Sequence, residues 1–302
     1  MGLGMRILFI TSNRIGDAVI STGLLDHLIH TDPACRITIV CGPVAEGVFA
    51  RMPNRERTIL FEKRPRDLHW LVLWQDVVRV RWDLVIDLRQ SVLAYLVRTG
   101  RRIVKQPGTG GLRKYEQLGR LMGLDPAPLP VVWTAAPDRA RAAALLDPGP
   151  VIGLGPTANW PPKAWPAERF AALFHALAAG SLPGAVPAVF AGPGSAERAM
   201  AAPLLALLPG AIDLCGKLTL PEAAACLQRC AVFIGNDSGL MHLAAAAGIP
   251  TVGLCSTTQD RAAEMAPAGR HAAWALGDGV SMDGLAVPDA LAVATRLLRE
   301  AS

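Results

Sequence analysis

The chain has 302 residues, of which 51% are hydrophobic and 18% charged, with a formal net charge of +5. This balance excludes a disordered chain, and the length favours two domains. Six cysteines without Cys-x-x-Cys or zinc-ligand spacing argue against a metal site and a disulfide framework, so we expect core thiols in a reducing, cytoplasmic setting. No apolar run is long enough to predict a signal peptide or a membrane span.

Apolar and amphipathic segments alternate along the whole chain. We expect strands at 5–11, 36–41, 84–88, 151–154, 188–191, 232–235 and 249–254. We expect helices at 18–30, 166–179, 195–207 and 221–229, with a short helix and a proline-rich linker in 133–150. This alternation predicts an α/β protein with parallel sheets and helical crossovers. Because the pattern restarts after the linker, we expect two doubly wound domains, 1–148 and 149–302.

Positive charge is concentrated in the first half. Residues 1–148 have a net charge of +7 and residues 149–302 a net charge of −2. The cations cluster in 51–66 and 98–114, which suits an anionic substrate or an acidic membrane surface, although either cluster could equally be a solvated face. Nucleic acid is not the expected partner, since aromatic residues make up only 5% of the chain and no nucleic-acid-binding motif accompanies the clusters.

The segment 234–254, IGNDSGLMHLAAAAGIPTVGL, predicts an anion site. It contains a strand end, a tight turn and the start of a short helix. Gly235 and Gly239 would free the backbone around Asp237 and Ser238, either of which could cap the helix. The helix amides and dipole would then point at a phosphate. The alternative is an ordinary β-α-β unit without a ligand.

Four motifs together resemble one known family. They are NRIGDAVIST at 13–22, KAWP at 163–166, LCGKLTLPE at 214–222 and NDSGLMHLAAAAGIP at 236–250. In order and spacing they resemble the heptosyltransferases of lipopolysaccharide core synthesis, glycosyltransferase family nine. The resemblance implies a GT-B fold, in which two Rossmann-like domains face a central cleft. It also implies inverting transfer without a metal, with acceptor on the first domain and nucleotide-sugar on the second. The absence of an Asp-x-Asp motif agrees with this.

The resemblance also assigns roles to single residues. Asp17 takes the place of the catalytic base, which removes the proton of the acceptor hydroxyl. Its alternative role is a helix N-terminal carboxylate stabilised by the dipole. The expected acceptor-binding residues are Asn13, Arg14, Arg101 and Arg102.

On the donor side, Lys163 resembles the family's phosphate-binding lysine, and Asn159 takes the place of a polar residue that also reaches the phosphates. Ser238 and Gly239 would offer a hydroxyl and amides to the same oxygens. The remaining expected donor contacts are Asp237 to the sugar hydroxyls, Glu197 to the ribose, Leu218 at the adenine and His242 as an orienting residue.

The implied donor is ADP-heptose as a substrate, with no further cofactor and no metal. The implied acceptor is an anionic, lipid-linked glycan at the inner face of the cytoplasmic membrane. Gly23 and 255–258 depart from the family pattern. The change at 255–258 would lie at the rim of the cleft, and it leaves the donor sugar open. The alternatives are a non-catalytic GT-B nucleotide-sugar-binding protein and a transferase that uses a different nucleotide-sugar. An epimerase is not favoured, because the chain has neither G-x-G-x-x-G after the first strand nor Y-x-x-x-K.

Overall fold

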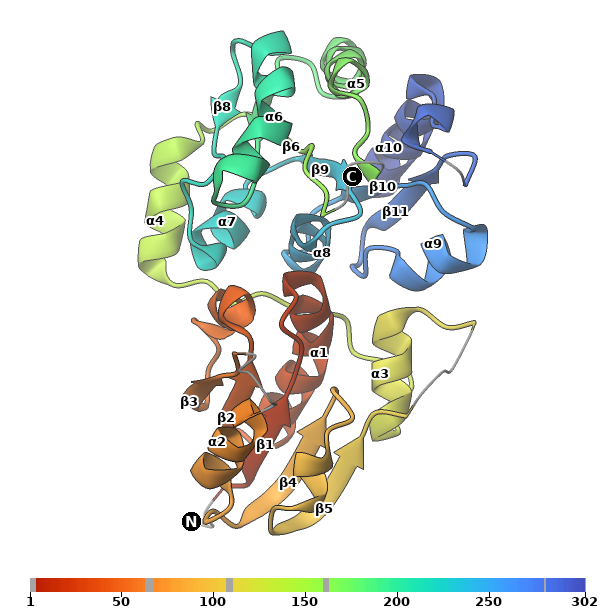
Figure 1. The fold of residues 1–302 in the computed structure, drawn as a ribbon. Helices are drawn as coiled ribbons and strands as arrows, with labels where there is room; N and C mark the ends of the chain where they lie inside the picture. The colour runs from red at the N-terminus through yellow and green to blue at the C-terminus, as the bar shows by residue number, and fades with distance from the viewer. Residues whose placement is uncertain (1–3, 63–67, 107–110, 160–162, 280, 302) are drawn as a thin grey trace. The chain divides into compact units, whose positions relative to one another are not determined.

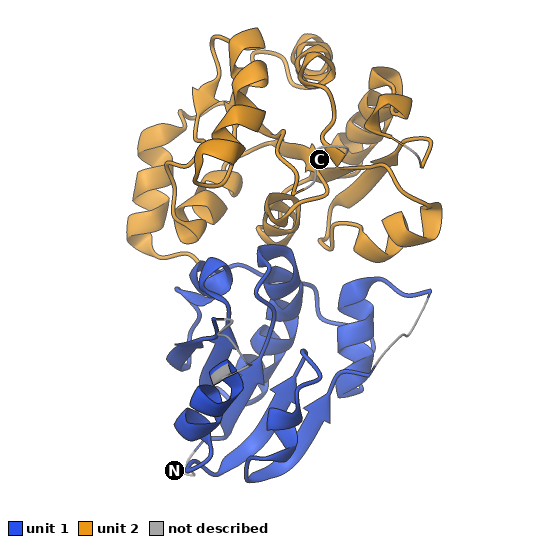
Figure 2. Ribbon diagram, in the orientation of Figure 1, with its two compact units in different colours: residues 1–133 blue, residues 134–302 orange. Residues whose placement is uncertain are grey.

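The computed structural model describes residues 4–62, 68–106, 111–159, 163–279 and 281–301 (Figure 1). The chain forms two compact units, 1–133 and 134–302 (Figure 2). Parts of both basic clusters, 63–66 and 107–110, lie outside the described residues. Within the described residues, no helix is long and apolar enough to cross a membrane.

The described part of the first unit contains a five-stranded parallel sheet in the order β3-β2-β1-β4-β5. The strands are β1 (Arg6–Ile10), β2 (Arg36–Cys41), β3 (Arg55–Leu60), β4 (Trp82–Asp87) and β5 (Thr99–Val104). The three central strands were predicted from their apolar runs and are confirmed. The two edge strands were missed, because RERTIL and TGRRIV are largely polar and lack a continuous apolar run.

The helical elements of this unit, as far as it is described, are α1 (Ile15–Thr31), η1 (Pro43–Phe49), α2 (Leu68–Val77), η3 (Val92–Tyr95) and α3 (Lys114–Met122). Helix α2 lies over one face of the sheet (Figure 1), where Leu8 and Ile10 of β1 pack with Leu73 and Val77. The alternate residues of β1 are equally buried, so both faces of the strand are covered. The predicted helix 18–30 is confirmed as α1, which begins early enough to place Asp17 in its first turn.

Gly23 lies at a close approach between α1 and the segment 128–131. A Cβ at this position would lie 2.6 Å from the Pro128 carbonyl oxygen and 2.7 Å from that of Leu129. Next to it, Thr22 Oγ1 donates to Val131 O at 2.7 Å and accepts from Val131 N at 2.9 Å. A larger residue at 23 would therefore push this segment away from the helix.

The described part of the second unit contains a six-stranded parallel sheet in the order β11-β10-β9-β6-β7-β8. The strands are β6 (Val151–Gly155), β7 (Val186–Val189), β8 (Ile212–Asp213), β9 (Val232–Asn236), β10 (Thr251–Cys255) and β11 (Ala272–Leu276). The described helical elements are α4 (Ala136–Leu145), α5 (Ala167–Ala179), α6 (Ser195–Leu207), α7 (Leu220–Leu227), α8 (Gly239–Ala246), α9 (Gln259–Met265), η5 (Met282–Gly284) and α10 (Val287–Ala301).

The core of the second unit fixes the loop that follows Lys163. Trp165 is buried, its indole Nε1 donates to Leu285 O at 2.9 Å, and its ring meets Phe170 of α5 edge-on at 5.1 Å. Phe170 packs in turn with Ile152 and Ile234 of the central strands. The sheet core therefore anchors the chain two residues beyond Lys163.

The division between the units falls at 133/134, whereas the proline-rich linker suggested a boundary at 148/149. The reason is that the ends of α4 are bonded to the residues just after α7. Thr134 Oγ1 donates to Gln228 Oε1 at 3.4 Å, and Arg229 Nη2 donates to Leu146 O at 3.1 Å. Helix α4 thereby packs with the second unit, although it precedes the linker.

The six cysteines all lie in described residues, and all are free and buried, as the sequence predicts. Burial raises the pKa of Cys41, Cys215 and Cys255 to about 12 and that of Cys226 to about 11. These thiols therefore stay protonated at neutral pH and act as core side chains.

Candidate active site

In the first unit, the sheet reverses its winding direction between β1 and β4. The chain runs from β1 to β2 and β3 on one side, and from β4 to β5 on the other. Ligands of doubly wound sheets bind beyond the carboxyl ends of the strands at such a point. The residues that follow β1 include Asn13, Arg14 and Asp17, and Arg89 follows β4.

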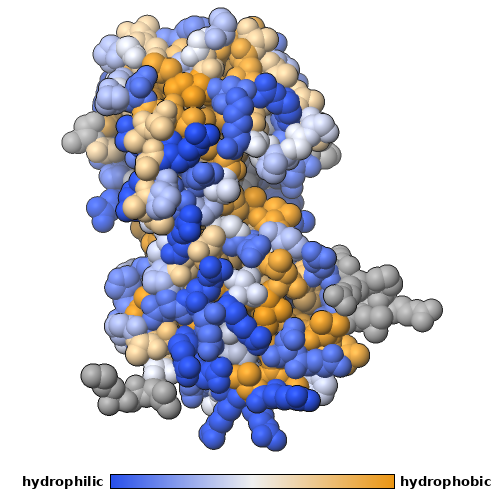
Figure 3. Space-filling view, turned by 90° about the vertical axis from the view of Figure 1, so that its left-hand side faces the viewer, coloured by the Kyte–Doolittle hydropathy of each residue, from blue (hydrophilic) through white to orange (hydrophobic). Residues whose placement is uncertain are grey.

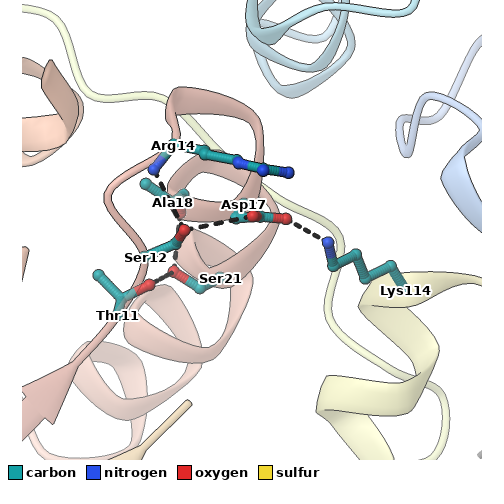
Figure 4. Close-up of polar contacts among 7 residues, drawn as sticks. All are labelled: Thr11, Ser12, Arg14, Asp17, Ala18, Ser21 and Lys114. Atoms are coloured by element: carbon teal, nitrogen blue, oxygen red, sulfur yellow. Dashed lines mark hydrogen bonds and ion pairs between the residues drawn. The ribbon is translucent and has the colours of Figure 1, made fainter. Parts of the chain in front are cut away.

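Asp17 is partly buried in the first turn of α1, and its carboxylate is held by neighbours on both sides (Figure 4). Ser12 Oγ donates to Asp17 Oδ2 at 3.2 Å, and Lys114 Nζ donates to Asp17 Oδ1 and forms an ion pair with it. Burial raises the pKa of Asp17, but the hydrogen bond and charge of Lys114, with Ser12 and Arg14, outweigh it, so the pKa lies below its usual value. Asp17 is therefore an ionised carboxylate at neutral pH.

Lys114 was missed as a site residue by the sequence reasoning. It begins α3 and reaches across to the start of α1 (Figure 4), although 97 positions separate it from Asp17. The available signal was its place at the end of the basic cluster 98–114, but nothing in that cluster distinguishes Lys114 from its neighbours. Only the tertiary fold selects it.

Arg89 was also missed, and it is paired with an expected acceptor-binding residue. Arg89 Nη1 donates to Asn13 Oδ1 at 2.6 Å, and its guanidinium lies over the Phe61 ring at 4.7 Å. Burial lowers the pKa of Arg89, while the charge of Asp87 opposes that shift. Asn13, Arg14, Asp17, Arg89 and Lys114 thus form a mainly cationic group at the carboxyl edge of this sheet.

Arg101 and Arg102 do not join that group. Both lie within β5, level with Leu84 and Val85 of β4, and so below the carboxyl edge. As successive strand residues they point to opposite faces of the sheet. Arg102 lies on the η3 side, where its Nε donates to Ala94 O and its guanidinium stands over the Tyr95 ring at 5.1 Å.

In the second unit, the winding reverses between β6 and β9, the two central strands. Asn159 and Lys163 follow β6, and Asp237, Ser238 and Gly239 follow β9, so these five expected donor-binding residues all follow the strands at the switch point. Asn159 is exposed and immediately precedes 160–162, which lie outside the described residues.

Three hydrogen bonds join the loop after β6 to the end of β9. Lys163 Nζ donates to Asp237 Oδ2 at 2.7 Å in a partly buried ion pair. The buried Asn236 side chain donates to Pro156 O at 2.7 Å and accepts from Trp165 N at 3.1 Å. Asn236 thus fixes the backbone on both sides of Lys163.

The expected capping of α8 is corrected by the structure. Ser238 occupies the N-cap position, but its side chain makes no capping hydrogen bond, and Asp237 is paired with Lys163 instead. The buried Ser238 Oγ has no hydrogen-bond partner within the described residues. The hydroxyl at the start of α8 is therefore not committed to the helix.

The φ of Gly235 is not positive, so the backbone there does not need a glycine. The glycine is needed instead because there is no space for a side chain. A Cβ there would lie 2.6 Å from the Phe233 ring and 3.2 Å from Gly155 O. The small residue keeps β6 and β9 close at the switch point.

The other expected donor residues have separate environments. Glu197 is in the first turn of α6 and accepts a hydrogen bond of 3.2 Å from Gly192 N. Leu218 is half-buried and follows the turn at Gly216, whose φ is +69°. His242 is buried within α8. Among the described residues, no three His, Cys, Asp or Glu side chains are grouped so that they could hold a metal ion.

Comparisons with known proteins place this arrangement in a family. A family model described as "Glycosyltransferase family 9 (heptosyltransferase)" matches residues 100–276. The chain is 26% identical over 301 residues to lipooligosaccharide heptosyltransferase 2 of Haemophilus influenzae, with 84% of each chain covered.

Solved structures share the whole fold. The glycosyltransferase family 9 protein of Veillonella parvula matches with a TM-score of 0.80 at 22% identity, over 99% of both chains. The E. coli ADP-heptose LPS heptosyltransferase II matches with a TM-score of 0.75 at 20% identity, over 98% of this chain and 99% of that one. These matches and the two parallel sheets confirm the predicted GT-B class. Since the family model covers more than half of the chain, the protein belongs to glycosyltransferase family 9, the heptosyltransferase family.

Proposed function

We propose that the protein transfers a heptose or a related sugar from an ADP-activated donor to a lipopolysaccharide-core or similar anionic glycan, with inversion and without a metal. Membership of family 9 supports the reaction class. The names of the relatives, a lipooligosaccharide heptosyltransferase and an ADP-heptose LPS heptosyltransferase, support the donor and the acceptor. The acceptor would be lipid-linked, at the inner face of the cytoplasmic membrane.

The observation that carries the proposal is the ionised Asp17 at the switch point of the first sheet, held by Lys114 and Ser12. In the reaction, the acceptor oxygen attacks the anomeric carbon while the bond from that carbon to the diphosphate oxygen breaks. Asp17 takes the proton of the attacking hydroxyl. A carboxylate of low pKa suits this step, because the hydroxyl becomes acidic only as the new bond forms.

The negative charge of the departing diphosphate must be stabilised. In this proposal the positive charge of Lys163 and hydrogen bonds from the Ser238 hydroxyl and the first amides of α8 do so, in place of a metal ion. Lys163 is 31% exposed and its partner Asp237 20% exposed, so a diphosphate can approach the pair. Asp237 would then contact the sugar, with Asn159, Gly239, Glu197, Leu218 and His242 completing the donor site.

The proposed acceptor contacts are Asn13, Arg14, Arg89 and Lys114, because these lie with Asp17 at one edge of the sheet. Arg101 and Arg102 are left out of this group, since their positions within β5 place them away from that edge.

The test is to incubate the protein with ADP-heptose and a heptose-free core glycan, and to follow ADP release and product mass. We expect stoichiometric ADP and a glycan heavier by one heptose. Donor binding without transfer would instead favour a nucleotide-sugar-binding protein. Parallel incubations with GDP-, UDP- and dTDP-sugars decide whether another nucleotide is used.

A further inference from the structure

Helices α2 and η3 expose apolar side chains on one side of the first unit. Leu71 of α2 is 51% exposed, Val92 and Tyr95 of η3 are 70% and 61% exposed, and Leu96 is 57% exposed. Trp74 Nε1 of α2 donates to Leu96 O at 3.2 Å, which joins the two helices side by side. Single exposed apolar residues are ordinary, whereas a contiguous group indicates a binding surface.

An arginine-lined cavity adjoins these side chains. It has a volume of about 490 Å³ and is lined by Arg79, Arg81, Val97, Arg98, Thr99 and Arg102. Arg102 belongs to both features, because its guanidinium stands over the exposed Tyr95 ring at 5.1 Å. Within the described residues, no acidic side chain forms an ion pair with any of the four arginines. On the face that Figure 3 shows, hydrophobic and hydrophilic residues lie side by side on the surface of the first unit.

Two acidic residues, Asp76 and Asp83, lie close in sequence to the arginines that line the cavity. Asp83 accepts a hydrogen bond of 2.8 Å from Arg6 N, and Asp76 of α2 lines a different pocket, with His69 and Val72. The residues that line the cavity therefore include four arginines and no acidic residue.

This combination fits an anionic bilayer better than a second copy of the chain. A symmetric dimer through this surface would bring two sets of arginines together, which repel. A bilayer offers phosphodiester headgroups, which guanidinium groups bind with paired hydrogen bonds, and an apolar layer below them. Tyrosine and tryptophan favour that boundary. Stable attachment needs two signals, and this surface has an apolar one and a cationic one.

We propose that the surface formed by Leu71, Trp74, Val92, Tyr95, Leu96 and the arginine-lined cavity, here called the docking surface, binds an anionic lipid bilayer. Lipid phosphodiesters occupy the cavity, and the leucines and Val92 enter the headgroup boundary. Arg81 and Arg98 immediately precede β4 and β5, so the cavity lies toward the amino ends of the strands, away from Asp17 at the carboxyl edge. Docking therefore leaves the candidate active site of this unit uncovered.

The experiment measures sedimentation of the full chain with glycan-free vesicles. We expect binding to mixed phosphatidylglycerol and phosphatidylcholine vesicles, little binding to phosphatidylcholine alone, and weakening as salt rises. The Arg79→Gln/Arg81→Gln variant should bind about 25-fold more weakly, since each arginine near such a surface contributes roughly fivefold. Leu71→Ser/Leu96→Ser should also reduce binding, and the loss should persist at low salt.

Matched controls lie on the second unit. Arg296→Gln/Arg299→Gln removes two exposed arginines of α10, and Leu207→Ser removes an exposed leucine, and both should bind as wild type. Thermal unfolding checks that all variants are folded. Equal losses in the control and surface pairs would reduce the effect to net charge and overturn the proposal, as would a wild-type chain that ignores anionic vesicles. If the wild-type chain is a dimer and Leu71→Ser/Leu96→Ser is a monomer, the docking surface binds a second copy of the chain instead of a bilayer.

Vesicle binding is independent of the proposed sugar transfer, because the vesicles contain no glycan. Transfer to a water-soluble acceptor should be unchanged in Arg79→Gln/Arg81→Gln. An inactive protein that still binds anionic vesicles would refute the proposed function and leave the docking surface standing.

Discussion

Lys163 Nζ lies 2.7 Å from Asp237 Oδ2, so an ion pair joins the loop after β6 to the turn after β9 at the switch point of the second sheet. The family resemblance gives these residues different partners, the diphosphate for Lys163 and the sugar for Asp237. A donor must therefore draw the lysine at least partly from its carboxylate. Partly exposed ion pairs are weak, and a diphosphate carries more charge than one carboxylate, so we expect this exchange to be favourable.

Lys163→Met should lower kcat/KM for the donor roughly 10- to 100-fold, since a hydrogen bond to a charged group contributes about 1.5–3 kcal/mol. Lys163→Arg should recover part of the loss because it keeps the charge. Steady-state kinetics with varied donor measure this. Arg296→Met, an exposed cation on α10, is the control, and an equal loss there would show that the effect is not local.

Asp17→Asn should lower kcat roughly 100-fold or more, because the amide keeps the shape but cannot accept the proton. Donor affinity, measured by calorimetry, should change little. Asp26→Asn in the same helix is the control, since Asp26 pairs with His30 one turn further along α1. Turnover near the wild-type rate in Asp17→Asn would reduce Asp17 to a helix N-terminal carboxylate.

Lys114→Met should move the acidic limb of the kcat/KM profile to higher pH. Burial raises the pKa of Asp17, and Lys114 is the main group that lowers it, so removing the lysine leaves burial opposed only by Ser12 and Arg14. The ionised base is present above this pKa and is lost as pH falls through it. Lys114→Arg should keep the limb in place. An unchanged limb in Lys114→Met would mean that Asp17 does not set it.

Transfer should survive an excess of EDTA. The reason is that Lys163 and the α8 amides are proposed to meet the charge of the leaving diphosphate, the task that a metal ion performs in other transferases. Initial rates with and without chelator provide the measurement. A rate that collapses with EDTA and returns with magnesium or manganese contradicts the mechanism.

Gly23→Ala should destabilise the fold by about 1–3 kcal/mol, the usual cost of forcing an extra group into a packed contact. The new Cβ would meet the Pro128 carbonyl oxygen at 2.6 Å. Denaturant unfolding measures the change. Gly149→Ala is the control, because a Cβ there meets nothing within 4 Å and should leave stability almost unchanged.

The buried strands, most helices and the two switch-point loops could be predicted from the sequence. These are local properties, because an apolar run, a glycine turn and a small-residue helix can each be recognised within a few residues, as in 234–254. The order of the four motifs also determined the family. The core cysteines could be predicted because no metal-ligand spacing accompanies them.

The pairing of the charged residues, in contrast, follows from the tertiary fold. Lys114 meets Asp17 across 97 positions, and Arg89 meets Asn13 across 76. The fold also separates Arg101 from Arg102, which were expected to act together, because it places them on opposite faces of β5. The edge strand β5 was itself not predicted, because its sequence is largely polar. Such pairings depend on strand order and crossover paths, and the sequence near each residue carries no record of its distant partner. The periodicity of a chain encodes which faces are buried, whereas contacts between side chains at a sheet edge are set by how the whole sheet is wound.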